Sequence, residues 1–374
     1  MKNSYIMPVI IFCIIFGFVH GCDQSTSVDS EMLDVPDPTE IITIPGQAFA
    51  LGTNPDGSLL VSETFEGLIE IRKSTTDHIA ALQNINGIAT VGNDIQYVIT
   101  GDPFIPEQQE TGRKLYRITP ENTQEIADFW AFEQSVNPDR VWSTLPPESN
   151  PYGIEQLNDD TFLVADAAGN SVLVVDESGA IDWVAVLTPQ PASTENFKHL
   201  IGCVENDQRP PCQMPEEIPA EPVPTGLAIG PDGGYYVGEL VGFPEELGIA
   251  RIWRIEPGSR QVLCPGESCT LVADGFTAIM DMAFGPDGTL YVVEFDAAGW
   301  FALQDVGGFP LTPIEGGRVK ACNVGTGECV VIADELNLPT GITVGKDGTI
   351  WIAENEGIDV APNPNMTASI RAVK

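Results

Sequence analysis

A carboxylate recurs at a fixed place in this sequence, seven positions after an aspartate that stands at a tight turn. Oxygen ligands of this kind suit Ca²⁺ or another hard cation. They also serve architecture when each carboxylate accepts hydrogen bonds from backbone N–H groups of its own loop. Because the feature obeys the repeat, whereas a binding site should break it, we favour the architectural interpretation. The five carboxylates are Glu63, Asp166, Glu239, Glu294 and Glu354.

The turns before these carboxylates belong to six copies of one pattern. Each copy has an apolar strand, a turn around an aspartate and a second apolar strand, as in GLAIGPDGGYYVGE and GITVGKDGTIWIAE. A third strand follows each copy, a fourth follows most, and no long helical pattern competes. Four strands per repeat and six repeats predict an all-β fold, a six-bladed β-propeller. The turn residues are Asp56, Asp94, Asp159, Asp232, Asp287 and Asp347.

The two ends of the chain are expected to close the propeller. The last copy stops after its third strand, and EIITIPG at 40–46 is a strand with no blade of its own. We predict that 40–46 pairs beside the strand near Ile370, which would hide an exposed edge. Long inserts fall only between second and third strands or between blades, and these places share one face of a propeller. This insert-bearing face is the predicted binding surface. The inserts are 101–113, 133–150, 187–223, 239–250, 294–317 and 355–369.

Asp281 breaks the repeat at the entry of a first strand, where other copies have glycine. First strands line the central channel, so desolvation there should raise the pKa of this carboxyl unless a cation or donors compensate. We weigh a binding role equally against a hydrogen bond to the backbone of the neighbouring blade. Asn86 and Tyr152 precede their glycines and could present polar atoms to the same opening. Asp281, Glu294 and Asn86 form the candidate set for a metal ion, with Ca²⁺ as the candidate cofactor.

Other side chains carry less chemistry. His78 and His199 lie near no serine in a nucleophile setting, and no phosphate-binding loop appears, so the catalytic residues are unknown. Aromatic residues in the inserts could stack on a flat or apolar ligand, although packing a loop onto its blade is the more common role. These aromatic residues are Phe104, Tyr152, Phe243, Trp300, Phe301 and Phe309.

The beginning of the chain predicts export. MKNSYIMPVIIFCIIFGFVHGC has a basic start and an apolar run over about 5–19, too short for an ordinary membrane span and typical of a secretory signal at 1–21. Its ending resembles a bacterial lipobox, which makes Cys22 the expected lipid anchor at the periplasmic or surface side of the cell envelope. Cleavage beyond Cys22 by an ordinary signal peptidase is the alternative. An acidic tether at 22–39 would then lead to the propeller at 40–374.

Six further cysteines fall into three close pairs, which agrees with export. Short loops bounded by cysteines outside the cytosol predict disulfides. A zinc site is the alternative, but no histidine lies near any pair and no C-x-x-C occurs. The pairs are Cys203 with Cys212, Cys264 with Cys269, and Cys322 with Cys329.

The charge of the chain restricts its partners. The 374 residues include 54 acidic against 17 basic side chains, a formal net charge of −37. No nucleic acid is expected to bind, because neutralising phosphates requires Lys or Arg. The charge also favours a soluble monomer that meets the membrane through its lipid only.

The order of four stretches is specific: they are NPYGIEQLNDDTFLVADAAGNSVLVVD, VPTGLAIGPDGGYYVGELVGFP, IMDMAFGPDGTLYVVEF and LPTGITVGKDGTIWIAENEG. Over about residues 44–370 they resemble the ScyD/ScyE family of NHL-repeat, TolB-like propellers. That family is distantly similar to the gluconolactonase (SMP-30) and strictosidine synthase propellers. The resemblance implies an exported six-bladed propeller. Lactonases hold a divalent metal with Glu, Asn and Asp at inner-strand entries, but here Thr225 and Thr340 replace the expected Asn, only Asn86 keeps its Asn-Gly pair, and Asp281 is shifted by one.

Two function classes therefore compete. The first is a binding or scaffold protein whose insert-bearing face takes a small molecule, a glycan or a protein. The alternative is a metal-dependent lactonase- or esterase-like hydrolase centred on Asp281, Glu239, Glu294 and Asn86. They differ in whether those side chains converge within coordinating distance at the channel mouth.

Overall fold

The computed structural model describes residues 35–64, 66–73, 75–103, 105, 108–303, 314–358 and 365–373. Leu33–Lys374 forms one compact unit. The expected signal peptide, the expected lipid anchor Cys22 and most of the tether lie outside the described residues. Phe104 and Phe309, two of the aromatic residues in the inserts, lie outside them as well.

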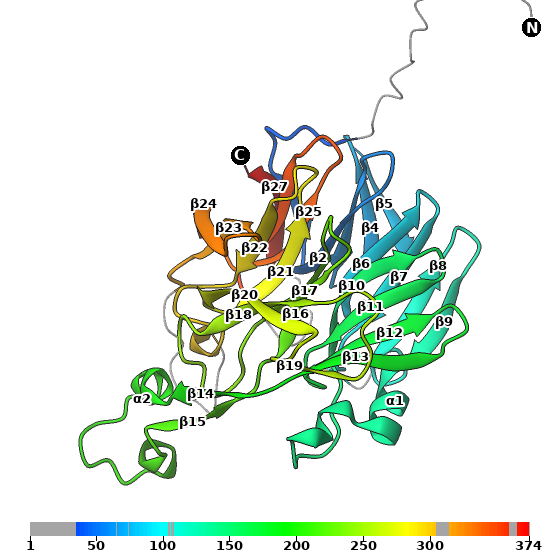
Figure 1. Cartoon of the computed structure of the whole chain (residues 1–374). Helices are drawn as coiled ribbons and strands as arrows, with labels where there is room; N and C mark the ends of the chain where they lie inside the picture. Colours follow the sequence, from blue (N-terminus) through cyan, green and yellow to red (C-terminus); the bar gives the residue numbers. More distant parts are fainter. Residues whose placement is uncertain are drawn as a thin grey trace, which may run out of the picture. The chain divides into compact units, whose positions relative to one another are not determined.

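Six antiparallel sheets form a six-bladed β-propeller, which confirms the predicted fold (Figure 1). The first strands of neighbouring blades contact each other around the whole ring. The first three blades are β2 (Ala48–Thr53), β3 (Leu59–Glu63), β4 (Gly67–Arg72) and β5 (Thr75–Ala80); β6 (Ile85–Gly92), β7 (Ile95–Thr100), β8 (Lys114–Ile118) and β9 (Thr123–Asp128); and β10 (Pro151–Asn158), β11 (Thr161–Asp166), β12 (Ser171–Asp176) and β13 (Ile181–Leu187).

The other three blades follow the same plan, and the last takes its outer strand from the beginning of the chain. They are β16 (Pro224–Ile229), β17 (Tyr235–Glu239), β18 (Ala250–Ile255) and β20 (Cys269–Phe276); β21 (Ile279–Phe284), β22 (Leu290–Glu294), β23 (Gly317–Asn323) and β24 (Glu328–Leu336); and β25 (Pro339–Val344), β26 (Ile350–Asn355), β27 (Thr367–Val373) and β1 (Ile42–Pro45).

β1 closes the ring as predicted. It pairs antiparallel with β27, and Ile42 lies opposite Ile370. Ile44 is buried, with 4% of its surface exposed, in a cluster that also contains Trp351 and Ile370. The first and last parts of the propeller are therefore joined by both a backbone ladder and apolar packing.

The recurring Asp-Gly turns have a physical reason. Asp287 Oδ1 accepts a hydrogen bond from Thr289 N at 3.0 Å, and Asp347 Oδ1 accepts one from Thr349 N at 2.9 Å. The glycines between them have φ values of 83° at Gly288 and 84° at Gly348, a conformation that strains residues with a side chain. Each turn therefore fixes where the second strand of its blade begins.

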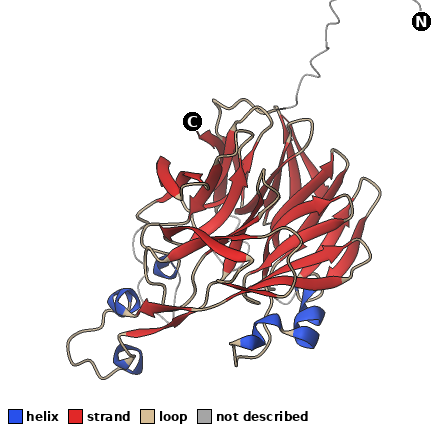
Figure 2. Cartoon of the chain, viewed as in Figure 1, coloured by secondary structure: helices blue, strands red, loops and turns tan. Residues whose placement is uncertain are grey.

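The inserts carry the helices and leave from the ends of second or fourth strands, the insert-bearing face (Figure 2). After β9 come α1 (Phe129–Val136) and the 3₁₀ turn η2 (Pro138–Val141). Between β13 and β16, the hairpin of β14 (Gln190–Ser193) and β15 (Glu217–Ala220) encloses α2 (Glu195–Leu200) and η3 (Pro210–Gln213). A third 3₁₀ turn, η4 (Phe301–Leu303), follows β22.

One strand differs from the sequence-based expectation. β19 (Val262–Cys264), in the segment between β18 and β20, pairs in parallel with β13 of the preceding blade. The third blade therefore has a fifth strand. Three residues are too few to show a period of two, so the sequence pattern could not reveal it.

All three predicted disulfides are present. They join Cys203 to Cys212, Cys264 to Cys269, and Cys322 to Cys329, with Cα–Cα distances of 5.6, 5.1 and 4.1 Å. The Cys264–Cys269 bridge ties β19 to β20. It thereby fastens the segment that reaches across to the third blade.

Closure by β1 predicts that Ile44→Asp lowers the free energy of unfolding by about 3 kcal/mol or more, because it places an unpaired charge in the closing cluster. Urea unfolding followed by tryptophan fluorescence measures the change. Ile41→Asp is the matched control, since Ile41 is 64% exposed, and it should change stability by less than about 0.5 kcal/mol. Equal effects of the two variants would contradict closure by β1.

Candidate functional site

Most of the strand-end carboxylates bind the backbone of their own blade. Glu63 accepts a hydrogen bond from the backbone N–H of Glu66, in the loop that follows it. Three others accept from the segment that leads into their blade. These pairs are Asp166 Oδ1 with Asn150 N at 2.7 Å, Glu294 Oε1 with Thr277 N at 2.6 Å, and Glu354 Oε1 with Asn337 N at 2.7 Å.

Basic side chains neutralise several of the same carboxylates. Glu239 accepts from Arg251 Nε and Nη2, both at 2.8 Å, and from Trp253 Nε1 at 2.8 Å. Lys320 Nζ lies 2.9 Å from Glu294 Oε2, and Arg371 pairs with Glu354. These carboxylates thus have partners inside their own blades.

The structure does not gather the predicted metal ligands into one site. Glu294 is engaged by Thr277 and Lys320, and Glu239 by Arg251 and Trp253. Neither is among the residues that line the central cavity, whereas Asp281 and Asn86 both line it. Within the described ranges, one trio of His, Cys, Asp or Glu side chains has its ligand atoms within 4.8 Å of one another. It comprises Cys203, Asp207 and Cys212, whose cysteines form a disulfide.

Glycines set the width of the channel. A Cβ atom at Gly153 would lie 2.6 Å from the carbonyl oxygen of Thr225, and one at Gly87 would lie 2.8 Å from that of Tyr152. Both contacts are with the backbone of the next blade, which cannot yield as a flexible side chain would. Glycine at these strand entries therefore allows neighbouring first strands to approach closely.

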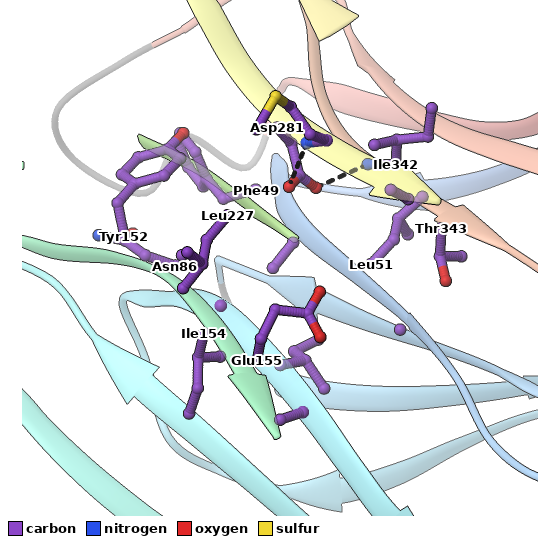
Figure 3. Close-up of a pocket in the computed structure, with 18 of the residues that line it drawn as sticks. Phe49, Leu51, Asn86, Tyr152, Ile154, Glu155, Leu227, Asp281, Ile342 and Thr343 are labelled. Atoms are coloured by element: carbon purple, nitrogen blue, oxygen red, sulfur yellow. Dashed lines mark hydrogen bonds between the residues drawn. The ribbon is translucent and has the colours of Figure 1, made fainter. Parts of the chain in front are cut away.

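Asp281 stands at the corresponding entry of the fifth blade. Its Oδ1 accepts a hydrogen bond from Met282 N at 2.8 Å, and its Oδ2 accepts one from Ile342 N of the sixth blade at 2.9 Å (Figure 3). Burial raises the pKa of Asp281 to about 7, although the two backbone N–H groups act in the opposite direction. Asp281 thus both joins two blades and places a readily protonated carboxyl in the channel.

Glu155 is a second acid in the same cavity, and sequence reasoning missed it. Its carboxyl and that of Asp281 both point into a cavity of about 350 Å³ lined by the first strands of the blades (Figure 3). Burial, together with the negative charge of Asp281, raises the pKa of Glu155 to about 8. The sequence did contain a signal for Glu155. It stands two positions after the glycine at the entry of its first strand, and no other copy aligned on that entry position has an acid there. The corresponding residues are Ala89, Ala228, Ala283 and Thr343.

Tyr152 and Asn86 line the cavity as well. The Tyr152 hydroxyl is buried without a hydrogen-bond partner among the described residues, and burial followed by the charge of Asp281 raises its pKa. Asn86 Nδ2 donates to the carbonyl oxygen of Pro151 at 3.0 Å and to Asn150 Oδ1 at 3.3 Å. Asn86 therefore fastens the entry to the third blade, while the Tyr152 hydroxyl is buried without a partner.

The aromatic residues of the inserts mainly contact one another. Phe197 and Phe243 have ring centroids 4.7 Å apart, and Trp300 and Phe301 have theirs 5.3 Å apart. Buried Glu245 accepts a hydrogen bond from Phe301 N at 2.7 Å and another from Trp300 N, which fixes that loop. Burial raises the pKa of Glu245 to about 8. This arrangement accounts for the aromatic residues as loop packing, with Phe243 partly exposed.

Comparison with known proteins identifies the architecture and not a family. No family model matches the sequence, and no curated protein matches it either. Many solved structures share the fold, and three of them illustrate the level of similarity. A putative oxidoreductase (glucose dehydrogenase) of Thermus thermophilus is 15% identical over 89% of this chain and 99% of its own, with a TM-score of 0.50.

A gluconolactonase of Xanthomonas campestris is 12% identical over 89% of each chain, with a TM-score of 0.50. A protein of unknown function from Bacteroides thetaiotaomicron is 10% identical over 91% of this chain and 74% of its own, with a TM-score of 0.51. Similarities at this level show the β-propeller fold alone. Membership of the ScyD/ScyE family stays a prediction.

The raised pKa of Glu155 predicts a pH-dependent stability. A carboxyl whose pKa is higher in the folded than in the unfolded state stabilises the fold while protonated, so the free energy of unfolding falls as pH rises from about 4.5 towards about 8. Glu155→Gln should reduce that loss by about 1–2 kcal/mol between pH 5 and pH 8.5. Urea unfolding at the two pH values measures it. Glu217→Gln, an exposed control in β15, should leave the wild-type loss unchanged, and a Glu155→Gln profile equal to wild type would refute the assignment.

Proposed function

We propose that this chain is an extracytoplasmic binding propeller that takes a small, positively charged or hydrogen-bond-donating molecule into its central cavity. One observation carries the proposal. The Glu155 carboxyl faces the cavity beside that of Asp281, and it has no hydrogen-bond partner among the described residues (Figure 3). Unpaired polar groups in a buried place cost free energy, and a ligand that pairs with them recovers it.

The size and chemistry of the cavity support a small ligand. Its volume of about 350 Å³ lies at the lower end of the range for small-molecule sites, well short of what a polymer would need. Two carboxyls with raised pKa values are acceptors when ionised, and a cationic group beside them would favour ionisation. A glycan or protein partner would instead contact the insert-bearing face around the opening.

The cellular place is part of the same proposal. Cleavage before Cys22 and acylation of its thiol would anchor the tether, with the propeller outside the cytoplasm. The three disulfides are consistent with an oxidising compartment. Among the described helices, none has the length and apolar character needed to cross a bilayer.

A hydrolase is the second candidate, and Asp281 together with Glu155 favours it. Pairs of acids with raised pKa values in one cavity are a common basis for acid–base chemistry. A divalent cation held by their carboxyl oxygens would supply a polarised water or carbonyl. Glu239 and Glu294, which belong to the predicted hydrolase centre, have partners elsewhere and would take no part.

Calorimetry with methylamine, choline and 1,4-diaminobutane tests the binding proposal. We expect at least one of these cations to bind with a stoichiometry of one, because two acceptor carboxyls face it. Glu155→Gln should weaken that binding about tenfold or more, since it removes a charged partner. Glu217→Gln is the control for the loss of one negative charge from the whole chain. Failure of all three probes to saturate, or equal binding by Glu155→Gln, would overturn the proposal.

Hydrolysis of D-glucono-1,5-lactone, followed in a pH-stat with CaCl₂ present, tests the second candidate. Turnover above the uncatalysed rate that disappears in Asp281→Asn would replace binding with catalysis as the assigned function. Turnover that persists in both Asp281→Asn and Glu155→Gln would exclude the channel as the catalytic centre.

A further inference from the structure

A second group of acidic side chains lies outside the cavity, in the insert between β9 and β10. Glu133 stands in α1, Asn137 ends that helix, and Asp139 lies in η2. Only 1% of Glu133 and 7% of Asp139 is exposed. Glutamate and aspartate side chains are rarely buried to this extent. When they are, they require a partner of opposite charge or a full set of hydrogen bonds.

The Asn137 side chain lies between the two carboxyls because of the local backbone. Asn137 has φ 45°, and its N–H donates to the Glu133 carbonyl oxygen at 2.8 Å, which ends α1 and turns the chain back. In the structure its amide oxygen faces both carboxyls, so three oxygens converge. The reverse orientation would put Nδ2 there, 3.2 Å from Glu133 Oε1 and 2.7 Å from Asp139 Oδ1. The orientation of the Asn137 amide therefore decides between two arrangements. With its oxygen towards the carboxyls the group can bind a cation, and with its nitrogen there the amide forms a hydrogen-bonded bridge.

The second carboxyl oxygen of Glu133 argues for the cation. Glu133 Oε2 is buried and has no hydrogen-bond partner among the described residues. An Asn137 amide that bridges the two carboxyls would bond only Glu133 Oε1 and leave Oε2 unpaired. A cation bound by both carboxyl oxygens of Glu133 would give Oε2 a partner. No Lys, Arg or His in the described part of the chain forms an ion pair with Glu133 or Asp139. Arg113, which lies over the Trp130 ring of α1, pairs with Asp102.

The surrounding charges are negative as well. Burial, followed by the charges of Asp166 and Asp139, raises the pKa of Glu133 to about 9. The pKa of Glu221 is also raised, by burial and then by Asp139 and Glu148. A divalent cation would offset this repulsion, and a cation of the hard class matches carboxyl and amide oxygens.

We propose that Glu133, Asn137 and Asp139 bind one Ca²⁺ ion that fixes the insert 129–150 on the propeller. Glu133 supplies both carboxyl oxygens, Asn137 its amide oxygen and Asp139 Oδ1, and water completes the coordination. Asn170 extends the effect, because its Nδ2 donates to Asp139 Oδ2 at 3.1 Å and its Oδ1 accepts from Val223 N at 3.3 Å. The site therefore links the insert to the third blade, which carries Asn170, and to Val223 just before the fourth.

The test is calorimetric titration of the purified protein with CaCl₂, combined with thermal unfolding. Wild type should bind one Ca²⁺ and unfold at a higher temperature as CaCl₂ is added. Glu133→Gln and Asp139→Asn should each weaken binding about tenfold or more and remove most of that shift in Tm. Glu133→Gln should still fold, since the amide has nearly the shape of the carboxyl and carries no charge to bury. Glu217→Gln should bind as wild type does.

Asn137→Asp separates the two orientations of the amide. At a cation site, the added carboxylate should tighten Ca²⁺ binding and keep the Ca²⁺-dependent rise in Tm. At a hydrogen-bonded bridge, wild type should bind no Ca²⁺, and the variant, in which a third negative charge replaces a donor, should have a lower Tm when Ca²⁺ is absent. The bridge result would overturn the proposal, as would a lack of saturable binding or binding that survives in both Glu133→Gln and Asp139→Asn.

Discussion

The close approach of neighbouring first strands around the channel is the constraint on which the structure depends. At Gly153 and Gly87 a Cβ atom would meet the backbone of the next blade within 2.6 and 2.8 Å. Six blades can therefore close into a ring with a narrow channel only if these entries carry almost no side chain. Asp281 does have a side chain at such an entry, and its Oδ2 accepts a hydrogen bond from Ile342 N of the next blade at 2.9 Å. Substitution at the entries is thus coupled to the geometry of the whole ring.

That constraint explains why two kinds of carboxyl coexist in the fold. The repeated ones lie at the ends of second strands, where loops and basic residues offer partners, as Arg251 does for Glu239. They stabilise the connections between strands and blades. Glu155 and Asp281 instead line a cavity whose lining residues include no Lys, Arg or His. Their pKa values rise because desolvation has no compensating charge.

The architecture could be predicted from the sequence because each blade is specified by residues close together in the chain. Asp-Gly turns, strands of five or six residues and a strand without a blade at 40–46 were enough for six blades and their closure. Spacing alone paired the six cysteines. β19 was missed because a three-residue parallel pairing leaves no periodic trace. α1 was missed because the apolar residues at its start were assigned to the fourth strand of the second blade, which ends at Asp128.

The site was predicted only in part, for reasons that are also physical. Asp281 was found because it breaks a glycine pattern, whereas Glu155 required alignment of positions two residues further on. Which carboxyls are neutralised depends on side chains such as Lys320 and Arg371, whose reach the sequence does not give. The Glu133, Asn137 and Asp139 group depends on one left-handed residue and on burial. Structures of the same fold that are only 10–15% identical do not indicate which residues of this chain bind or react.

The central claim is that the channel holds an acid poised near neutral pH. Carbon-13 NMR of the protein with labelled glutamate carboxyls tests it directly, with the Glu155 resonance assigned by its loss in Glu155→Gln. The account predicts that this resonance titrates near pH 8 and that Asp281→Asn lowers its midpoint, because a neighbouring negative charge is removed. A Glu155 resonance that titrates near pH 4.5, in wild type and in Asp281→Asn alike, would show a solvated carboxyl and contradict the account.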